Sequence, residues 1–151
     1  MAKYSANQIA DWFLAENRSR MQEGDSEYIT HLKLQKLLYY AQGCYLAIKG
    51  SPLFDEPILA WVHGPVVEKV YQKYKNKESN PIVYDECFDF NTIDEETSGI
   101  LREVFDVFGQ YSAWKLREMA HQETPWKSTR QNMVIKDDLI KEYFQQHYIE
   151  Q

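Results

Sequence analysis

The chain has 151 residues, of which 44% are hydrophobic, and it carries a net charge of −6 at pH 7. A chain of this length can bury a sizeable core, and we expect a single domain over residues 1–151. The acidic balance disfavours nucleic-acid binding, because a polyanion repels an acidic protein unless a local basic patch overrides the repulsion. The sequence has neither a long apolar run nor a signal-type start, which predicts a soluble cytoplasmic protein with no membrane partner.

Two local signals open the first predicted helix. Ser5 and, three residues later, Gln8 form a capping box, in which each side chain bonds the backbone of the other residue. The pattern that follows predicts a helix to about Arg18. The polar, glycine-containing stretch 18–28 then predicts a connecting segment.

The stretch 32–49 predicts a second, central helix. Thr30 stands where it can cap this helix, and Gly50 stands where it can end it. Apolar or small residues occupy nearly every side of the stretch, which is typical of a helix buried at the centre of a domain. Cys44 lies within it, so we expect a buried, inert thiol rather than a nucleophile.

A short apolar strand is predicted over residues 58–62. We expect Gly64 to end this strand and Pro65 to open a helix in one step, because proline is favoured at the first helical position. Apolar residues at helical spacing extend that predicted helix to Lys75.

The rest of the chain predicts a polar loop over 76–80, a candidate strand over 82–84 and three further helices. The expected cap residues of these helices are Asp94, Ser112, and either Asp137 or Asp138. The predicted fold is therefore mostly α with a small β-sheet (α+β). It has about six helices packed around the central helix at residues 32–49, with two or three short strands.

Metal and nucleotide chemistry have no signature in the sequence. The histidines and cysteines lack the spacings HxxxH, HExxH and CxxC, and no glycine-rich phosphate loop occurs. We therefore expect no metal, no cofactor and no enzymatic activity. One alternative stays open, a small hydrolase or transferase in which His63, His121 and Glu123 handle protons.

Two short stretches combine histidine, proline and tryptophan: AWVHGPVV at 60–67 and HQETPW at 121–126. Proline stiffens the backbone, and large rings held on stiff backbone make good interface anchors. We expect the two stretches to lie near each other and to form one rigid surface. The candidate partner-binding residues are His63, Tyr71, His121, Glu123 and Trp126, of which Trp126 fits a core position equally well.

The segments LQKLLYYAQGCYLAIKGSPLF, AWVHGPVVEKVYQKYK and AHQETPWK, in this order, resemble the Panacea family. These are the SocA-like antitoxin domains, also described as phage-associated GepA-like proteins. The resemblance is strongest over 34–74 and 116–127. It implies a mostly helical antitoxin that neutralises a cognate protein toxin by direct contact. For one branch it also implies a proteolytic adaptor that delivers the toxin to the Clp protease.

Overall fold

The structure, a computed structural model, describes residues 2–24, 27–75 and 81–149, and the polar loop expected over 76–80 lies outside them. Within these ranges the chain forms seven α-helices, one 3-10 helix and one two-stranded sheet. This composition confirms the predicted class, mostly α with a small β-sheet. The elements in chain order are α1 (Ala6–Gln22), α2 (His31–Lys49), β1 (Ile58–Trp61), β2 (Gly64–Val67), α3 (Glu68–Tyr74), η2 (Phe90–Thr92), α4 (Glu95–Phe108), α5 (Ala113–Gln122), α6 (Thr124–Lys127) and α7 (Asp137–His147).

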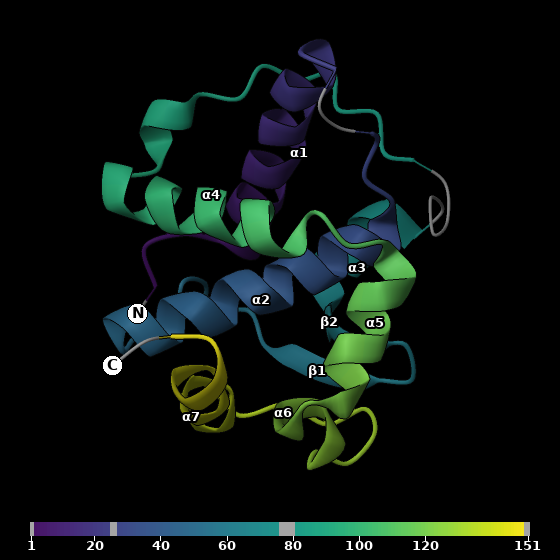
Figure 1. Ribbon diagram of the computed structural model, residues 1–151, viewed down its shortest axis with the longest axis vertical. Coiled ribbons are helices and arrows are strands. Elements are labelled where there is room, and N and C mark those ends of the chain that lie inside the picture. The colour runs from purple at the N-terminus through teal and green to yellow at the C-terminus, as the bar shows by residue number, and fades with distance from the viewer. Residues whose placement is uncertain (1, 25–26, 76–80, 150–151) are drawn as a thin grey trace.

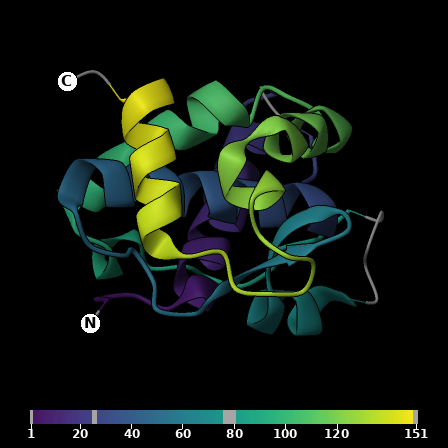
Figure 2. The same ribbon diagram turned by 90° about the horizontal axis from the view of Figure 1, so that it is seen from below.

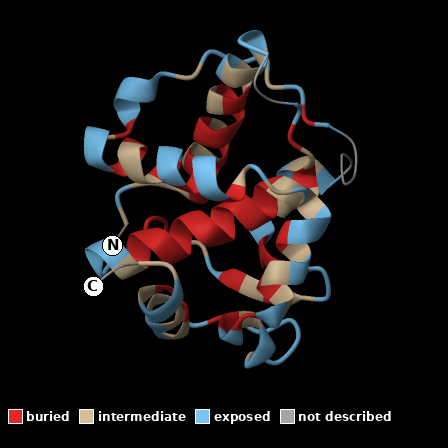
Figure 3. Ribbon diagram, in the orientation of Figure 1, coloured by how far each residue is buried: buried red, intermediate tan, exposed pale blue. Residues whose placement is uncertain are grey.

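Helix α2 lies at the centre of the fold, as predicted. It runs across the molecule between α1 and α4 on one side and α6, α7 and the hairpin on the other (Figure 1). It is buried along most of its length (Figure 3). Seen from below, α7 crosses α2 (Figure 2). Gly43 permits this close crossing, because a Cβ at that position would lie 2.4 Å from the ring of Phe144.

The helix start signals predicted from the sequence are confirmed for four helices. Ser5 and Gln8 make both bonds of the capping box, with N···O distances of 3.0 and 3.1 Å. At the start of α2, α4 and α5, the cap side chain accepts a hydrogen bond from the backbone N–H three residues later. These cap residues are Thr30, Asp94 and Ser112, respectively.

The first and last helices differ from the prediction at one end each. Helix α1 continues past Arg18 to Gln22, and Arg20 on this extension pairs with Glu16 at 3.0 Å. Helix α7 has Lys136 as its cap residue, so neither Asp137 nor Asp138 caps it. Both aspartates lie instead in the first turn, where their negative charges interact favourably with the helix dipole.

The prediction that Pro65 opens a helix is wrong. Strands β1 and β2 pair antiparallel, with Trp61 opposite Gly64 and Ala60 opposite Pro65, and α3 begins only at Glu68. Paired residues in an antiparallel ladder alternate between hydrogen-bonded and non-hydrogen-bonded pairs. Next to a two-residue loop Ala60 and Pro65 form the non-bonded pair, so the missing N–H of Pro65 costs the sheet no bond.

Other groups cover both edges of this hairpin. Residues 132–135 run along β1, where the Ala60 N–H donates to the Met133 carbonyl at 2.9 Å. On the other edge the Gln35 side chain acts like a strand, because its Oε1 accepts from the Val67 N–H at 2.8 Å. The candidate strand at 82–84 does not form, and a single bridge pairs Pro81 with Thr30.

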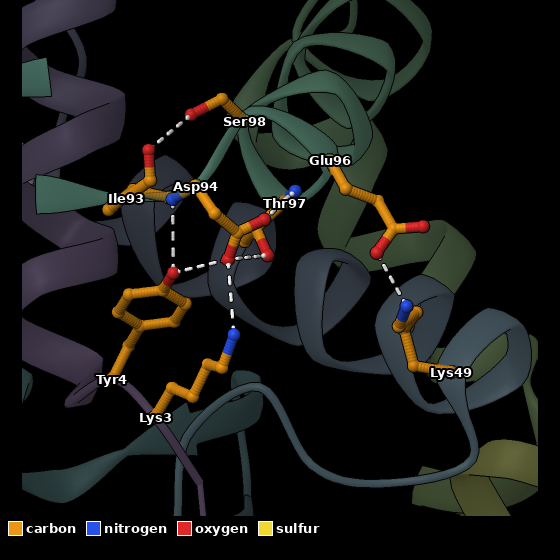
Figure 4. A network of polar contacts seen from close by, with 8 residues as sticks. All are labelled: Lys3, Tyr4, Lys49, Ile93, Asp94, Glu96, Thr97 and Ser98. Carbon is orange, nitrogen blue, oxygen red and sulfur yellow. Dashed lines mark hydrogen bonds and ion pairs between the residues drawn. The ribbon is translucent and has the colours of Figure 1, made fainter. Parts of the chain in front are cut away.

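A polar network ties the N-terminal segment to the start of α4 (Figure 4). The Tyr4 hydroxyl donates to the Asp94 carboxylate and accepts from the Asp94 N–H at 3.0 Å. Lys3 lies 3.8 Å from the same carboxylate. The hydrogen bond from Tyr4 is the largest cause that lowers the pKa of Asp94, to about 2.

Candidate functional site

The two proline-containing stretches 60–67 and 121–126 lie against each other, as expected. The Trp126 indole donates to the Trp61 carbonyl at 2.8 Å, and His121 Nε2 lies 2.9 Å from the Val62 carbonyl. A carbonyl only accepts, so Nε2 of His121 carries the proton in this bond. The rings of His121 and Trp126 pack with centroids 4.2 Å apart. These contacts fix both rings beside the hairpin.

Local sequence explains how the second stretch turns so tightly. His121 lies in the last turn of α5, and Glu123 then adopts an extended conformation with ψ of 142°. Pro125 occupies the first turn of α6, where its missing N–H would have had no helical partner. The turn therefore directs the side chains of His121 and Trp126 toward the hairpin.

Glu123 points the other way, into the interior. It is 3% exposed, and its carboxylate accepts hydrogen bonds from three tyrosines. Tyr39 and Tyr40 of α2 donate at 2.9 and 3.0 Å, and Tyr148 donates from the segment after α7. Burial raises the pKa of the Glu123 carboxyl, and the tyrosine bonds act against that rise. Glu123 thus fastens the 121–126 stretch to α2 and to the C-terminal segment.

This arrangement does not support an acid–base pair. In the described part of the chain, the hydrogen bonds of Glu123 go to tyrosines and that of His121 goes to a backbone carbonyl. His63 is exposed on the hairpin turn. Nothing in these contacts joins the three side chains into a proton-transfer site.

Tyr71 and His63 border a cavity of about 290 Å³ on α3, the hairpin and the start of α2. The Tyr71 ring meets the edge of Trp61 at 4.8 Å between centroids and packs against His31 at 5.0 Å. Val66 and the other lining residues make the walls largely apolar, which is typical of sites that take a side chain or a small ligand. The sequence did not predict that His31 lines this cavity, because its ring is buried by contacts with Tyr71 and Tyr74 of α3, which lies far from it in the sequence.

A second surface feature on α5 was also not predicted. Trp114 is 61% exposed, its indole donates to Glu118 at 2.8 Å, and the Arg117 guanidinium lies 4.8 Å from its ring centroid. The exposure of Trp114 could have been predicted from the sequence, because Leu116 and Ala120 define the buried face of α5 and Trp114 does not lie on it.

Other groups limit the chemistry that this chain offers. Burial raises the pKa of the Cys44 thiol to about 12, which keeps it protonated at neutral pH. Across residues 2–24, 27–75 and 81–149, no three histidine, cysteine or acidic side chains cluster as metal ligands would. None of the helices in those ranges combines the length and apolarity needed to span a membrane.

Comparison with known proteins identifies the family. The family model described as "Antitoxin SocA-like, Panacea domain" matches residues 34–127, more than half of the chain and including both stretches of the candidate surface. Antitoxin SocA of Caulobacter vibrioides (strain NA1000 / CB15N) is 50% identical over 44 residues, which are 29% of this chain and 23% of that protein. The match therefore spans less than a quarter of that curated relative. No solved structure matches the chain. The chain belongs to the SocA-like antitoxin family, as a Panacea domain.

Proposed function

We propose that this protein is an antitoxin that neutralises a cognate protein toxin by direct binding in the cytoplasm. The family match and the name of the Caulobacter relative support this role. The structural observation that carries the proposal is the joining of the 60–67 and 121–126 stretches into one surface by two side-chain-to-backbone hydrogen bonds.

The proposed toxin-binding surface consists of His63, Tyr71, His121 and Trp126 with the cavity beside Tyr71. The rings of Tyr71, His121 and Trp126 are already held by hydrogen bonds and ring contacts, so binding would order few of these side chains. Tryptophan and tyrosine are frequent hot-spot residues at protein interfaces. Glu123 supports this surface from the interior and does not touch the toxin.

The experiment measures toxin affinity and thermal stability on the same variants. Tyr71→Ala and Trp126→Ala are expected to weaken toxin binding by about 2 kcal/mol or more, roughly 25-fold in Kd. Tyr28→Ala is the matched control, because Tyr28 is an exposed tyrosine outside the lining of the Tyr71 cavity. Folded variants that bind the toxin as tightly as the wild type would refute the proposed surface.

A finer proposal concerns the fate of the toxin. By its resemblance to one branch of the family, the protein would act as an adaptor that delivers the bound toxin to the Clp protease. In that case the toxin should disappear from cells that contain Clp and persist in cells that lack it. Neutralisation that is equally effective in both kinds of cell would leave direct blocking as the mechanism.

A further inference from the structure

Four basic side chains gather at the hairpin turn. Lys36 of α2 has its Nζ 3.4 Å from the Pro65 carbonyl, and His121 of α5 bonds the Val62 carbonyl. Arg117 precedes His121 by one helical turn on the same face of α5, and His63 is part of the turn. We call these four residues, Lys36, His63, Arg117 and His121, the basic turn cluster.

The four groups are close enough to influence one another electrostatically. Burial is the largest cause that lowers the pKa of His121, and the charges of Arg117, Lys36 and His63 lower it further, against the bond to Val62. Burial followed by the charge of Arg117 lowers the pKa of Lys36 to about 7. In the described ranges none of the four takes part in an ion pair.

Lys36 is the most unusual member of the cluster. It is 0% exposed, and the one hydrogen bond that its amine makes to a described residue is long for a group that carries three donors when protonated. Gly64 makes room for it, since a Cβ there would lie 2.9 Å from Lys36 Cε. Arg117 adds a buried Nε with no hydrogen-bond partner among the described residues.

Buried cations are costly unless an opposite charge compensates them. Here the described part of the chain supplies no such charge, although the protein as a whole is acidic. Among the described residues, the cluster thus forms a basic site with no acidic side chain to compensate it. A partner that brought an anion to the turn would remove this cost.

We propose that the basic turn cluster binds the carboxylate of an acidic side chain on the protein partner. This inference rests on the proposed antitoxin function. Arg117 is the contact residue, because its planar guanidinium matches a carboxylate with two parallel hydrogen bonds. Lys36 lies beneath the turn, where a nearby carboxylate would favour its protonated form. The exposed Trp114 beside Arg117 favours a protein over a nucleic acid, since aromatic residues and arginine are enriched at protein interfaces.

The first test separates a binding role of Lys36 from a structural one. Lys36→Met replaces the buried amine, whose pKa burial lowers to about 7, with an apolar side chain of similar length. We expect the free variant to melt at a temperature equal to or above that of the wild type, and its toxin affinity to fall about tenfold. A lower melting temperature with unchanged toxin affinity would show that Lys36 only supports the hairpin, and would overturn the proposal.

The second test identifies the partner group. Arg117→Gln is expected to weaken toxin binding about tenfold, whereas Arg102→Gln, an exposed arginine on α4, should leave it unchanged. Each acidic residue of the toxin is then changed to its amide and paired with Arg117→Gln in a double-mutant cycle. One acidic residue should give clearly non-additive losses, and additive losses at every acidic position would overturn the proposal.

The remaining outcomes are also distinct. If the wild-type chain binds no toxin, the proposed function itself fails. If the wild type binds a labelled oligonucleotide and Arg117→Gln does not, while both bind the toxin equally, the cluster serves nucleic acid and the inference is wrong. If the toxin complex forms as proposed, NMR titration should show a higher pKa for His121 in the complex than in the free chain, because a carboxylate then faces its ring.

Discussion

Replacing Glu123 with alanine is expected to destabilise the fold strongly, because three tyrosines share its carboxylate. Tyr39 and Tyr40 lie 2.9 and 3.0 Å from its oxygens, and Tyr148 donates to it as well. A buried polar group left without a partner costs about 1–3 kcal/mol; Tyr39 and Tyr40 are buried whereas Tyr148 is partly exposed, so we expect a loss of about 2 kcal/mol or more. At roughly 2–4 °C per kcal/mol for a chain of this size, the melting temperature should fall by about 4 °C or more.

The assay is thermal and urea unfolding followed by circular dichroism. Tyr148→Phe is the matched control, since it removes one donor and leaves the carboxylate with two, and it should cost about 1 kcal/mol. A loss below about 1 kcal/mol for Glu123→Ala would refute the reasoning that these hydroxyls depend on the carboxylate.

Glu123→Gln tests the ionisation of the same group. Burial raises the pKa of Glu123 above 4.5, so the folded state holds this proton more tightly than the unfolded chain. The resulting stability is fully present below pH 4.5 and is lost as the pH rises through the folded-state pKa. Glutamine does not ionise, so the stability of the variant should lack this decline. Identical pH profiles for variant and wild type would contradict the assignment.

Two further changes test the hairpin and the N-terminal network. Gly64→Ala should cost about 1 kcal/mol or more, because Gly64 has φ +113° and a new Cβ would press on Lys36; an unchanged urea midpoint would show that the turn tolerates side chains. The hydrogen bond from Tyr4 leads the causes that lower the pKa of Asp94 from 3.8 to about 2, so this stability is present above pH 3.8 and lost as the pH falls toward 2. As the pH is lowered, the unfolding midpoint of the wild type should therefore approach that of Asp94→Asn. A constant difference between the two midpoints at every pH would contradict the proposed role of the network.

Local signals carried the predictions that the structure confirms. A cap joins residues three apart, so the caps at Ser5, Thr30, Asp94 and Ser112 can be identified in a short stretch of sequence. The prediction that Pro65 opens a helix was wrong because proline suits both the first turn of a helix and a strand position without a ladder hydrogen bond. Only its pairing with Ala60 decides between them, and that pairing is set by the register of the hairpin.

The candidate site likewise has one feature that was expected from the sequence and others that depend on long-range contacts. The expectation that the 60–67 and 121–126 stretches lie near each other is confirmed by the bonds of His121 and Trp126, whereas the orientation of Glu123 had no local signal. Its adjacency to His121 in the sequence suggested proton chemistry, but its partners Tyr39 and Tyr40 lie 84 and 83 residues away. The burial of Lys36 likewise depends on the hairpin folding over α2. Such long-range contacts have no local signature.

The measurement that tests the central claim most directly is growth rescue by co-expression. The chain is expressed together with the product of each neighbouring gene that arrests growth when expressed alone, and an affinity tag on the chain reports whether the two proteins purify as a complex. We predict restored growth and a stable complex, both lost in folded Trp126→Ala. Growth arrest despite abundant folded chain, or rescue without any complex, would contradict an antitoxin that acts by direct binding.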